Sequence, residues 1–192
     1  MKTESRWITL ARHGPVAVNW QSRIPGSGFA EFVEQLQASG IVPGSEPTTA
    51  AREQAREAGM LVCSDLQRSV ESAKVIAPTR PFLCESLFRE AEVPSKFRTS
   101  LSFRATTWVV LARMLWYVRR WSGIESRSEA RKRARQATSL LERLVEQEGS
   151  VFLIGHGYFN ALLARELRRR GWRGPTFPST QHWGATTYRQ AG

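Results

Sequence analysis

The chain has 192 residues and a formal net charge of +11 at pH 7, with 28 Lys and Arg against 17 Asp and Glu. This length favours one domain with an ample hydrophobic core. No apolar run reaches the length of about 18 residues that a membrane-spanning helix needs, and the N-terminal segment lacks the apolar stretch of a signal peptide. With only two cysteines and no such signal, a cytoplasmic location is expected.

The positive charge is concentrated in residues 113–143 and 165–173. Such runs are typical of solvated helix faces, but they would also attract an anionic substrate, an acidic lipid surface or nucleic acid. The sequence contains none of the standard nucleic-acid-binding motifs. We therefore expect small anionic molecules as partners, with an anionic surface as the alternative, and not nucleic acid.

A short apolar run, residues 7–11, is followed directly by Arg12, His13 and Gly14. The run is too short for a helix and is typical of a strand buried on both faces. Its carboxyl end is where open α/β sheets bind ligands, although a structural histidine beside a salt-bridged arginine would give the same tripeptide. Six residues after the histidine, Asn19 could donate to a phosphate oxygen or could end the loop as a turn residue.

A second predicted strand covers residues 60–63 and leads into a predicted helix. Ser64 or Asp65 is expected to cap this helix, which Pro78 ends. Arg68 then lies in the first turn, close to free backbone N–H groups that favour anions. This strand end therefore also carries a cation.

Two further predicted strands, residues 81–84 and 150–154, also lead into polar side chains. The first is followed by Glu90, and the second runs through a glycine into His156 and Gly157. Two arginines, two histidines and a carboxylate thus each follow a strand end. Packing alone does not explain this repetition.

The remaining apolar patterns predict five helices and a last edge strand. They cover residues 29–39, 49–58, 108–121, 126–148 and 159–170, and the strand covers 186–188. Strands that alternate with helices predict an α/β domain with a mostly parallel sheet. Ser126 and Glu129 have the spacing of a capping box, and His182 is expected to be a surface or structural histidine.

The helix predicted at residues 108–121 has two distinct faces. We expect its core-facing stripe to consist of Leu111, Met114, Leu115 and Val118. Another face carries Arg113, Trp116 and Arg120. That face is either an ordinary one, on which arginine stems cover apolar surface, or part of a cap that presents cations and an aromatic ring to a substrate or a membrane surface.

The strand-end motifs occur in an order that resembles the histidine phosphatase superfamily, also called the phosphoglycerate-mutase-like family. The matching stretches are residues 10–14, 64–68 with Ser72 and Ala73, Glu90, and 154–157, and Asn19 stands where many members carry an asparagine. The resemblance implies a three-layer α/β/α sandwich with a mostly parallel central sheet, formed by a single domain over residues 1–192. It does not cover residues 91–149, which we expect to form a small helical cap insertion.

The resemblance also implies phosphoryl transfer through a phosphohistidine on His13, with no metal and no cofactor. A small phosphorylated substrate would be bound by Arg12, Asn19, Arg68, His156 and Gly157. Two arginines suit this task because each guanidinium stays charged and offers a planar fork of donors. Nearby cations favour the neutral imidazole that must attack phosphorus, and three scattered histidines make a poor zinc site.

By the same resemblance, Glu90 protonates the leaving oxygen and then acts as the base toward water, and Glu92 is the alternative. The expected activity is that of a phosphoric monoester hydrolase of the histidine acid type. Pro15 and Val16 differ from the residues that many mutases of the family carry, which disfavours a phosphomutase. A non-catalytic anion-binding or regulatory module that uses the basic surface is the other alternative.

Overall fold

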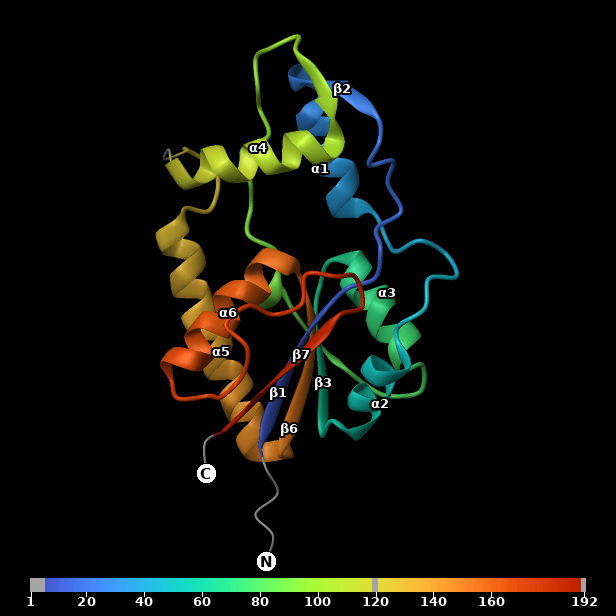
Figure 1. The fold of residues 1–192 in the computed structure, drawn as a ribbon, viewed down its shortest axis with the longest axis vertical. Helices are drawn as coiled ribbons and strands as arrows, with labels where there is room; N and C mark the ends of the chain where they lie inside the picture. Colours follow the sequence, from blue (N-terminus) through green and yellow to red (C-terminus); the bar gives the residue numbers. More distant parts are fainter. Residues whose placement is uncertain (1–5, 119–120, 191–192) are drawn as a thin grey trace, which may run out of the picture.

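The computed structural model describes residues 6–118 and 121–190 (Figure 1). Five strands in this part of the chain form a central sheet in the order β4-β3-β6-β1-β7. They are β1 (Trp7–Arg12), β3 (Met60–Ser64), β4 (Leu83–Glu85), β6 (Ser150–Gly155) and β7 (Ala185–Arg189). Neighbouring strands are parallel except β7, which runs antiparallel to β1 at one edge. The mostly parallel sheet and its last edge strand are confirmed.

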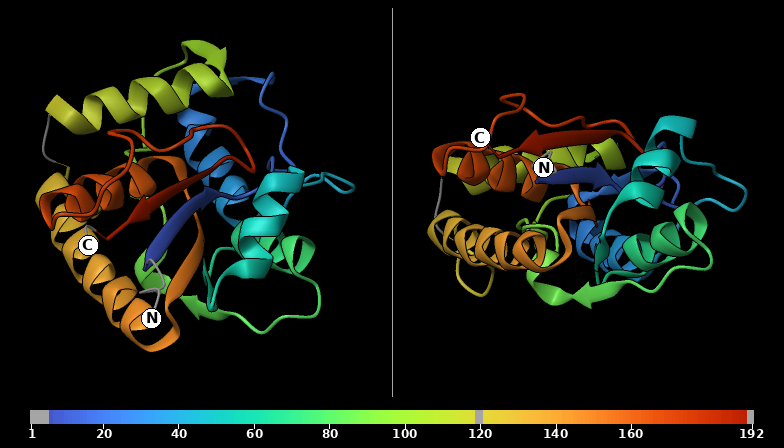
Figure 2. Two further views of the ribbon diagram at one scale, coloured as in Figure 1. Left: turned by 60° about the horizontal axis from the view of Figure 1, so that its bottom comes forward. Right: turned by 90° about the horizontal axis from the view of Figure 1, so that it is seen from below.

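Helices cover both faces of this sheet (Figures 1 and 2). One face packs against α5 (Arg127–Glu148) and α6 (Gly157–Arg169), and the other packs against α2 (Thr49–Glu57) and α3 (Gln67–Ile76). Side chains alternate along β6, so Leu153 joins the core with α5 and α6 whereas Phe152 joins the core with α2 and α3. The predicted three-layer α/β/α sandwich is confirmed.

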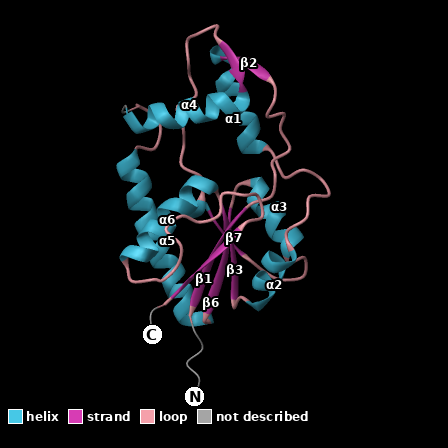
Figure 3. Cartoon of the chain, viewed as in Figure 1, coloured by secondary structure: helices cyan, strands magenta, loops and turns pink. Residues whose placement is uncertain are grey.

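A second group of elements lies beyond the carboxyl ends of the parallel strands (Figure 3). It contains β2 (Arg23–Pro25), the short turn η1 (Gly26–Gly28), α1 (Phe29–Ala38), β5 (Ser102–Arg104) and α4 (Ala105–Val118), and β2 pairs with β5 antiparallel. Stacked aromatic rings join α1 to α4 and to the segment before β5. The ring centroids are 5.7 Å apart for Phe29 and Trp108 and 5.2 Å apart for Phe97 and Trp108. We call this group of elements the cap.

The cap differs in extent from the insertion expected at residues 91–149. Ala134, Leu141 and Val145 of α5 are buried in the same core as β1 and β6, so α5 belongs to the sheet layers. The short pair β2–β5 and helix α1 bring residues 23–38 into the cap, because their apolar side chains pack against α4. We therefore propose that the cap combines two separate stretches of the chain and excludes α5.

Helix α4 turns a different face to the interior than the sequence pattern indicates. Its buried residues are Ala105, Trp108, Ala112 and Trp116. Of the expected core stripe, Leu111 packs against the core around Trp108, but Leu115 is 38%, Met114 61% and Val118 82% exposed, so the stripe is wrong at these three positions. The two indoles decide the face, since each is large and donates its N–H to a backbone carbonyl, those of Ile24 and Glu125, at 2.8 Å. Arg120 lies outside the described residues.

Helix ends are set by local hydrogen bonds. The capping box at the start of α5 is confirmed, because Ser126 and Glu129 exchange side-chain and backbone bonds. Helix α3 begins at Gln67, so the predicted cap by Ser64 or Asp65 is wrong; Asp65 instead forms a salt bridge with Arg89. Among the helices that the structure describes, none is long and apolar enough to cross a membrane.

Candidate active site

His13 and His156 meet because the strands that precede them are neighbours in the sheet. Arg12 and Gly155 are register partners at the ends of β1 and β6, and the backbone N–H of His13 donates to the carbonyl of Gly155 at 3.1 Å. The two imidazole centroids lie 5.0 Å apart, and both side chains are buried. Parallel pairing thus places two histidines from distant parts of the chain side by side.

One hydrogen bond fixes the tautomer of His13. Its Nδ1 lies 2.7 Å from the carbonyl oxygen of Gly14. A carbonyl oxygen can only accept, so Nδ1 carries the proton and donates it. The lone pair of the neutral ring is then on Nε2. His13 is therefore held with one nitrogen used for positioning and the other available as a nucleophile.

The surroundings favour the neutral form of both rings. Burial lowers the pKa of His13 well below the ordinary value of 6.5, and the cations Arg68 and Arg12 lower it further, against the effect of the bond to Gly14. Burial also lowers the pKa of His156 well below 6.5, followed by the effects of His13 and the two arginines. Both imidazoles are consequently neutral at pH 7, as a nitrogen nucleophile requires.

His156 has one engaged and one unpaired ring nitrogen. Its Nε2 lies 3.4 Å from Oγ of Ser69, while its buried Nδ1 has no hydrogen-bond partner within residues 6–118 and 121–190. When Ser69 donates to Nε2, the ring proton is on Nδ1. An unpaired buried donor is costly, so this N–H is suited to donate to an oxygen of a bound phosphoryl group.

Arg12 and Arg68 line the same cavity as the two histidines. Arg12 donates through Nη1 to the carbonyl of Thr180, and its buried Nε has no partner in the described part of the chain. Arg68, in the first turn of α3, is buried and donates to the carbonyl of Leu36 at 3.0 Å. Burial lowers the pKa of Arg68 to about 10, with Glu90 opposing this effect, so the side chain is still a cation at neutral pH.

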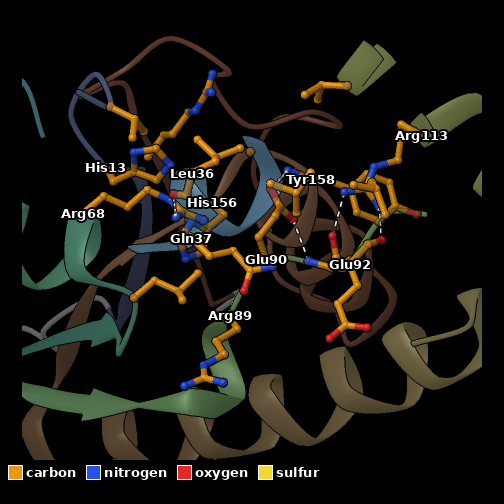
Figure 4. A pocket seen from close by; sticks show the side chains of 18 of the residues that line it. His13, Leu36, Gln37, Arg68, Arg89, Glu90, Glu92, Arg113, His156 and Tyr158 are labelled. Atoms are coloured by element: carbon orange, nitrogen blue, oxygen red, sulfur yellow. Dashed lines mark hydrogen bonds between the residues drawn. The ribbon is translucent and has the colours of Figure 1, made fainter. Parts of the chain in front are cut away.

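Glu90 is held at the start of α6, between the histidines and the outer part of the cavity (Figure 4). Its carboxylate accepts the backbone N–H groups of Ala91 at 2.9 Å, Tyr158 at 3.0 Å and Phe159 at 2.9 Å. Two donors at the α6 N-terminus are therefore bound to Glu90 and not free for a phosphate. The negative charge of Glu90 also raises the pKa of Arg12, against the larger effect of burial.

Glu92 lies in the same cavity on the side of Arg113 (Figure 4). It is exposed, and its Oε2 accepts the backbone N–H of Glu125 at 3.0 Å. The two candidate carboxylates are thus separated, and Glu90 is the one nearer the histidines in this view.

The predicted phosphate-binding residues do not all reach the cavity. Gly157 lines it, and a Cβ there would lie 3.7 Å from Nε of Arg12. Asn19 is exposed and is not part of the cavity wall that the described residues form. Its Oδ1 accepts the backbone N–H of Gln21 at 3.1 Å, and its carbonyl accepts that of Ser22 at 3.2 Å. Asn19 therefore closes a turn, the alternative that its position left open.

Sequence reasoning missed the contribution of the loop before β7. His182 Nδ1 donates to the backbone carbonyl of His13 at 3.1 Å, and the two ring centroids lie 5.5 Å apart. The ring of Trp183 lies against Gly14, where a Cβ would approach it to 2.5 Å, so only glycine fits there. No local pattern shows these contacts, because the loop reaches the site only through the pairing of β7 with β1.

One end of a cavity of about 860 Å³, which continues under the cap, is lined by Arg12, His13, Arg68, Glu90 and His156. The end near β1 and β6 gathers the half-buried cation of Arg12, the buried cation of Arg68, two neutral imidazoles and one carboxylate, which is an arrangement suited to a tetrahedral dianion. Within the described residues, no group of three His, Cys, Asp or Glu side chains is placed to hold a metal ion.

A sequence model of the histidine phosphatase superfamily (branch 1) matches residues 8–187. The match spans nearly the whole chain and includes every strand-end motif. The chain therefore belongs to the histidine phosphatase superfamily. No curated protein gives a significant match.

Solved structures of phosphatases share this fold. A mycobacterial glucosyl-3-phosphoglycerate phosphatase is 20% identical with a TM-score of 0.58, covering 86% of this chain and 80% of that one. A phosphoserine phosphatase variant from Entamoeba histolytica in complex with phosphoserine is 18% identical with a TM-score of 0.59, covering 94% and 89%. A putative α-ribazole-5'-P phosphatase from Escherichia coli is 16% identical with a TM-score of 0.55, covering 85% and 79%. At these identities the likeness concerns the fold.

Proposed function

We propose that this protein is a phosphoric monoester hydrolase that acts through a phosphohistidine on His13 and needs no metal. The observation that carries the proposal is the hydrogen bond from Nδ1 of His13 to the carbonyl of Gly14. It leaves Nε2 unprotonated in a cavity that also holds two arginines. Membership of the superfamily and the phosphatase names of the similar structures support the same reaction class.

In the first step, the guanidinium groups of Arg12 and Arg68 bind the phosphoryl oxygens, and Nε2 of His13 attacks phosphorus. The N–P bond forms as the bond from phosphorus to the ester oxygen breaks, and Nδ1–H of His156 donates to a phosphoryl oxygen. The leaving oxygen takes a proton from Glu90, which has first received that proton from the monoanionic form of the bound substrate. In the second step, the Glu90 carboxylate takes a proton from water, whose oxygen attacks phosphorus and releases phosphate and neutral His13.

Glu90 has room for the transferred proton. A carboxylate offers about four acceptor sites, and three of them are used by backbone N–H groups. The remaining site is the one we assign to the proton. Glu92 accepts a bond on the outer side of the cavity, so it is the weaker candidate for acid and base.

The test is phosphate release from an aryl phosphate in the presence of a chelator, with wild type and His13→Ala compared. We expect activity that survives the chelator and disappears in the variant. Rapid quenching should also trap an acid-labile phosphoryl group on His13, one of only three histidines in the chain. Equal activity in both proteins would refute the assignment of the nucleophile, and transfer without net phosphate release would favour a mutase.

A folded but inactive wild type that still binds anionic vesicles in a salt-sensitive way would favour the non-catalytic alternative. Part of the basic surface is already neutralised, since Arg169 and Arg170 both contact Glu166 and Arg133 contacts Glu125. The cytoplasmic location expected from the sequence stays a prediction.

A further inference from the structure

The part of the cavity beyond the phosphate-binding end is walled by apolar side chains. They come from α1, from α4, from the segment before β2 and from the segment after Glu92, and they are Trp20, Val33, Leu36, Val93, Val109, Val110 and Met114. Val110 and Met114 are 58% and 61% exposed although they line the cavity, which places them at its mouth. The apolar residues of α4 that lie outside its buried face with Trp108 and Trp116 thus have a role, because Val109, Val110 and Met114 form part of this wall.

The cavity is too large for a compact phosphorylated metabolite alone. Its volume of about 860 Å³ lies near the upper end of the roughly 300–1,000 Å³ that is typical of pockets that bury drug-sized ligands. A phosphate group with a three-carbon acid would leave most of the apolar wall uncovered. Covering that wall requires a substrate with a long or bulky non-polar part.

Two of the three described arginines outside the phosphate-binding end of the cavity are paired with a carboxylate of the protein. Arg89 contacts Asp65 at 2.6 Å and Arg133 contacts Glu125 at 2.7 Å. Arg113 donates to the carbonyl oxygens of Ala91 at 2.7 Å and Glu92 at 3.2 Å. Besides Arg12 and Arg68, these are the arginines among the described cavity residues, and lysine is absent from that set. A second anionic group on the substrate, such as a carboxylate, would find Arg89 and Arg133 already paired with a carboxylate. Within the described residues, Arg113 has only carbonyl oxygens and the rings of Trp116 and Tyr158 as partners, at 4.9 and 4.4 Å from the ring centroids.

We infer that the substrate is a phosphate monoester of a long-chain or bulky apolar alcohol. The inference rests on the proposed function, since it uses the same phosphate-binding end. The phosphate lies against His13, Arg12 and Arg68. The apolar chain runs along the apolar wall of the cavity to its mouth between Val110 and Met114. The removal of that apolar chain from water supplies the specificity for this substrate class.

The test is a series of primary alkyl phosphates from ethyl to octyl, kept below their micelle concentrations, with glycerol phosphate as a polar reference. Full burial of one methylene corresponds to about a fourfold gain, so half-burial of the six added methylenes predicts kcat/KM about fifty-fold higher for octyl than for ethyl phosphate. The matching alkylphosphonates cannot be hydrolysed, and their inhibition or binding constants should fall in parallel.

Paired variants locate the effect. The double variant Val110→Thr, Met114→Gln keeps side-chain size at exposed positions and should lower the octyl-to-ethyl ratio severalfold. Val118→Thr is the control, because Val118 lies on the same helix, is 82% exposed and is not among the residues of this cavity. It should leave the ratio unchanged.

The outcomes distinguish the proposed phosphatase activity from the inferred apolar substrate. A flat profile across the series with His13-dependent hydrolysis would overturn the apolar substrate and leave the phosphatase in place. If no ester is hydrolysed, the proposed function fails, and the phosphonates alone decide the inference: binding that tightens with chain length supports it, and binding independent of chain length overturns it.

Discussion

The imidazole of His182 donates to the backbone carbonyl of His13, the residue whose side chain bonds to the next carbonyl along the chain. Two consecutive carbonyl groups, those of His13 and Gly14, are therefore each bound by an imidazole N–H. These two bonds link the loop before β7 to the end of β1 and limit rotation of the His13 backbone and ring.

Replacement of His182 tests this link. Asn can keep an N–H donor toward the His13 carbonyl, whereas Phe cannot. We expect His182→Asn to retain most of the activity and His182→Phe to lose about tenfold in kcat/KM, the equivalent of one hydrogen bond. Steady-state kinetics on an aryl phosphate, with thermal unfolding as a check of folding, measure both. Equal losses in the two variants would show that the bond plays no part.

The lowered pKa of His13 predicts the acid side of the pH–rate profile. Protonation removes the lone pair, and because the folded-state pKa lies well below 6.5, kcat/KM should persist as the pH falls through 6.5 and decline only below it. Arg68→Met removes a cation that lowers this pKa, so the decline should move to higher pH while kcat/KM falls about 100-fold.

Lys74→Met is the matched control for Arg68, since Lys74 is an exposed cation on the same helix. Its profile should coincide with that of wild type. A decline of the wild-type kcat/KM centred at or above pH 6.5 would contradict the lowered pKa of the His13 imidazole.

The two carboxylates can be separated by the leaving group. If Glu90 protonates the leaving oxygen, Glu90→Gln should slow hydrolysis of an alkyl phosphate by about 10²–10⁴-fold. A nitrophenolate leaves without help, so the loss on that ester should be much smaller. Glu92→Gln should behave like wild type on both esters. An equal loss of Glu90→Gln on both would indicate instead that the variant has disturbed the start of α6.

Glu166, on helix α6, is expected to make the stability of the fold sensitive to acid. It is largely buried and accepts from Arg169 at 2.8 Å and from Arg170 at 2.9 Å. The bond from Arg169 is the largest of the effects that lower its pKa to about 2. A carboxylate with a depressed folded pKa stabilises the fold above its unfolded value of about 4.5, and this contribution is lost as the pH falls toward about 2.

Glu166→Gln should therefore lower the free energy of unfolding by about 2 kcal/mol at pH 7. The difference from wild type should shrink as the pH falls from about 4.5 toward about 2. Urea unfolding at several pH values measures both effects. Glu146→Gln, an exposed position on α5, serves as the control and should leave the free energy of unfolding within about 0.5 kcal/mol of wild type.

The strand ends could be predicted because their signal is local. Each short apolar run is followed within a few residues by a polar side chain, and parallel pairing turns that repeat into one edge of the sheet. The sequence therefore placed Arg12, His13, Arg68, Glu90 and His156 near one another, and all five line the cavity.

The failures come from contacts between distant segments. Helix α4 is apolar on several sides, so periodicity alone does not choose between the face with Met114 and the face with Trp116. The choice depends on carbonyl partners for the indoles, such as that of Ile24 on β2. His182 is a structural histidine, one of the two expected roles, but its contact with His13 could not be predicted for the same reason, since its position follows from the pairing of β7 with β1.

The position of β1 between β6 and β7 has a consequence for how the chain reaches its folded state. Residues 7–12 pair only with residues 150–155 and 185–189 in the described sheet. During synthesis this apolar strand emerges before both of its partners, a long-range topology that slows folding and leaves an unpaired edge open to aggregation. Dependence on a chaperone would thus be greatest for the nascent chain, until β7 pairs with β1.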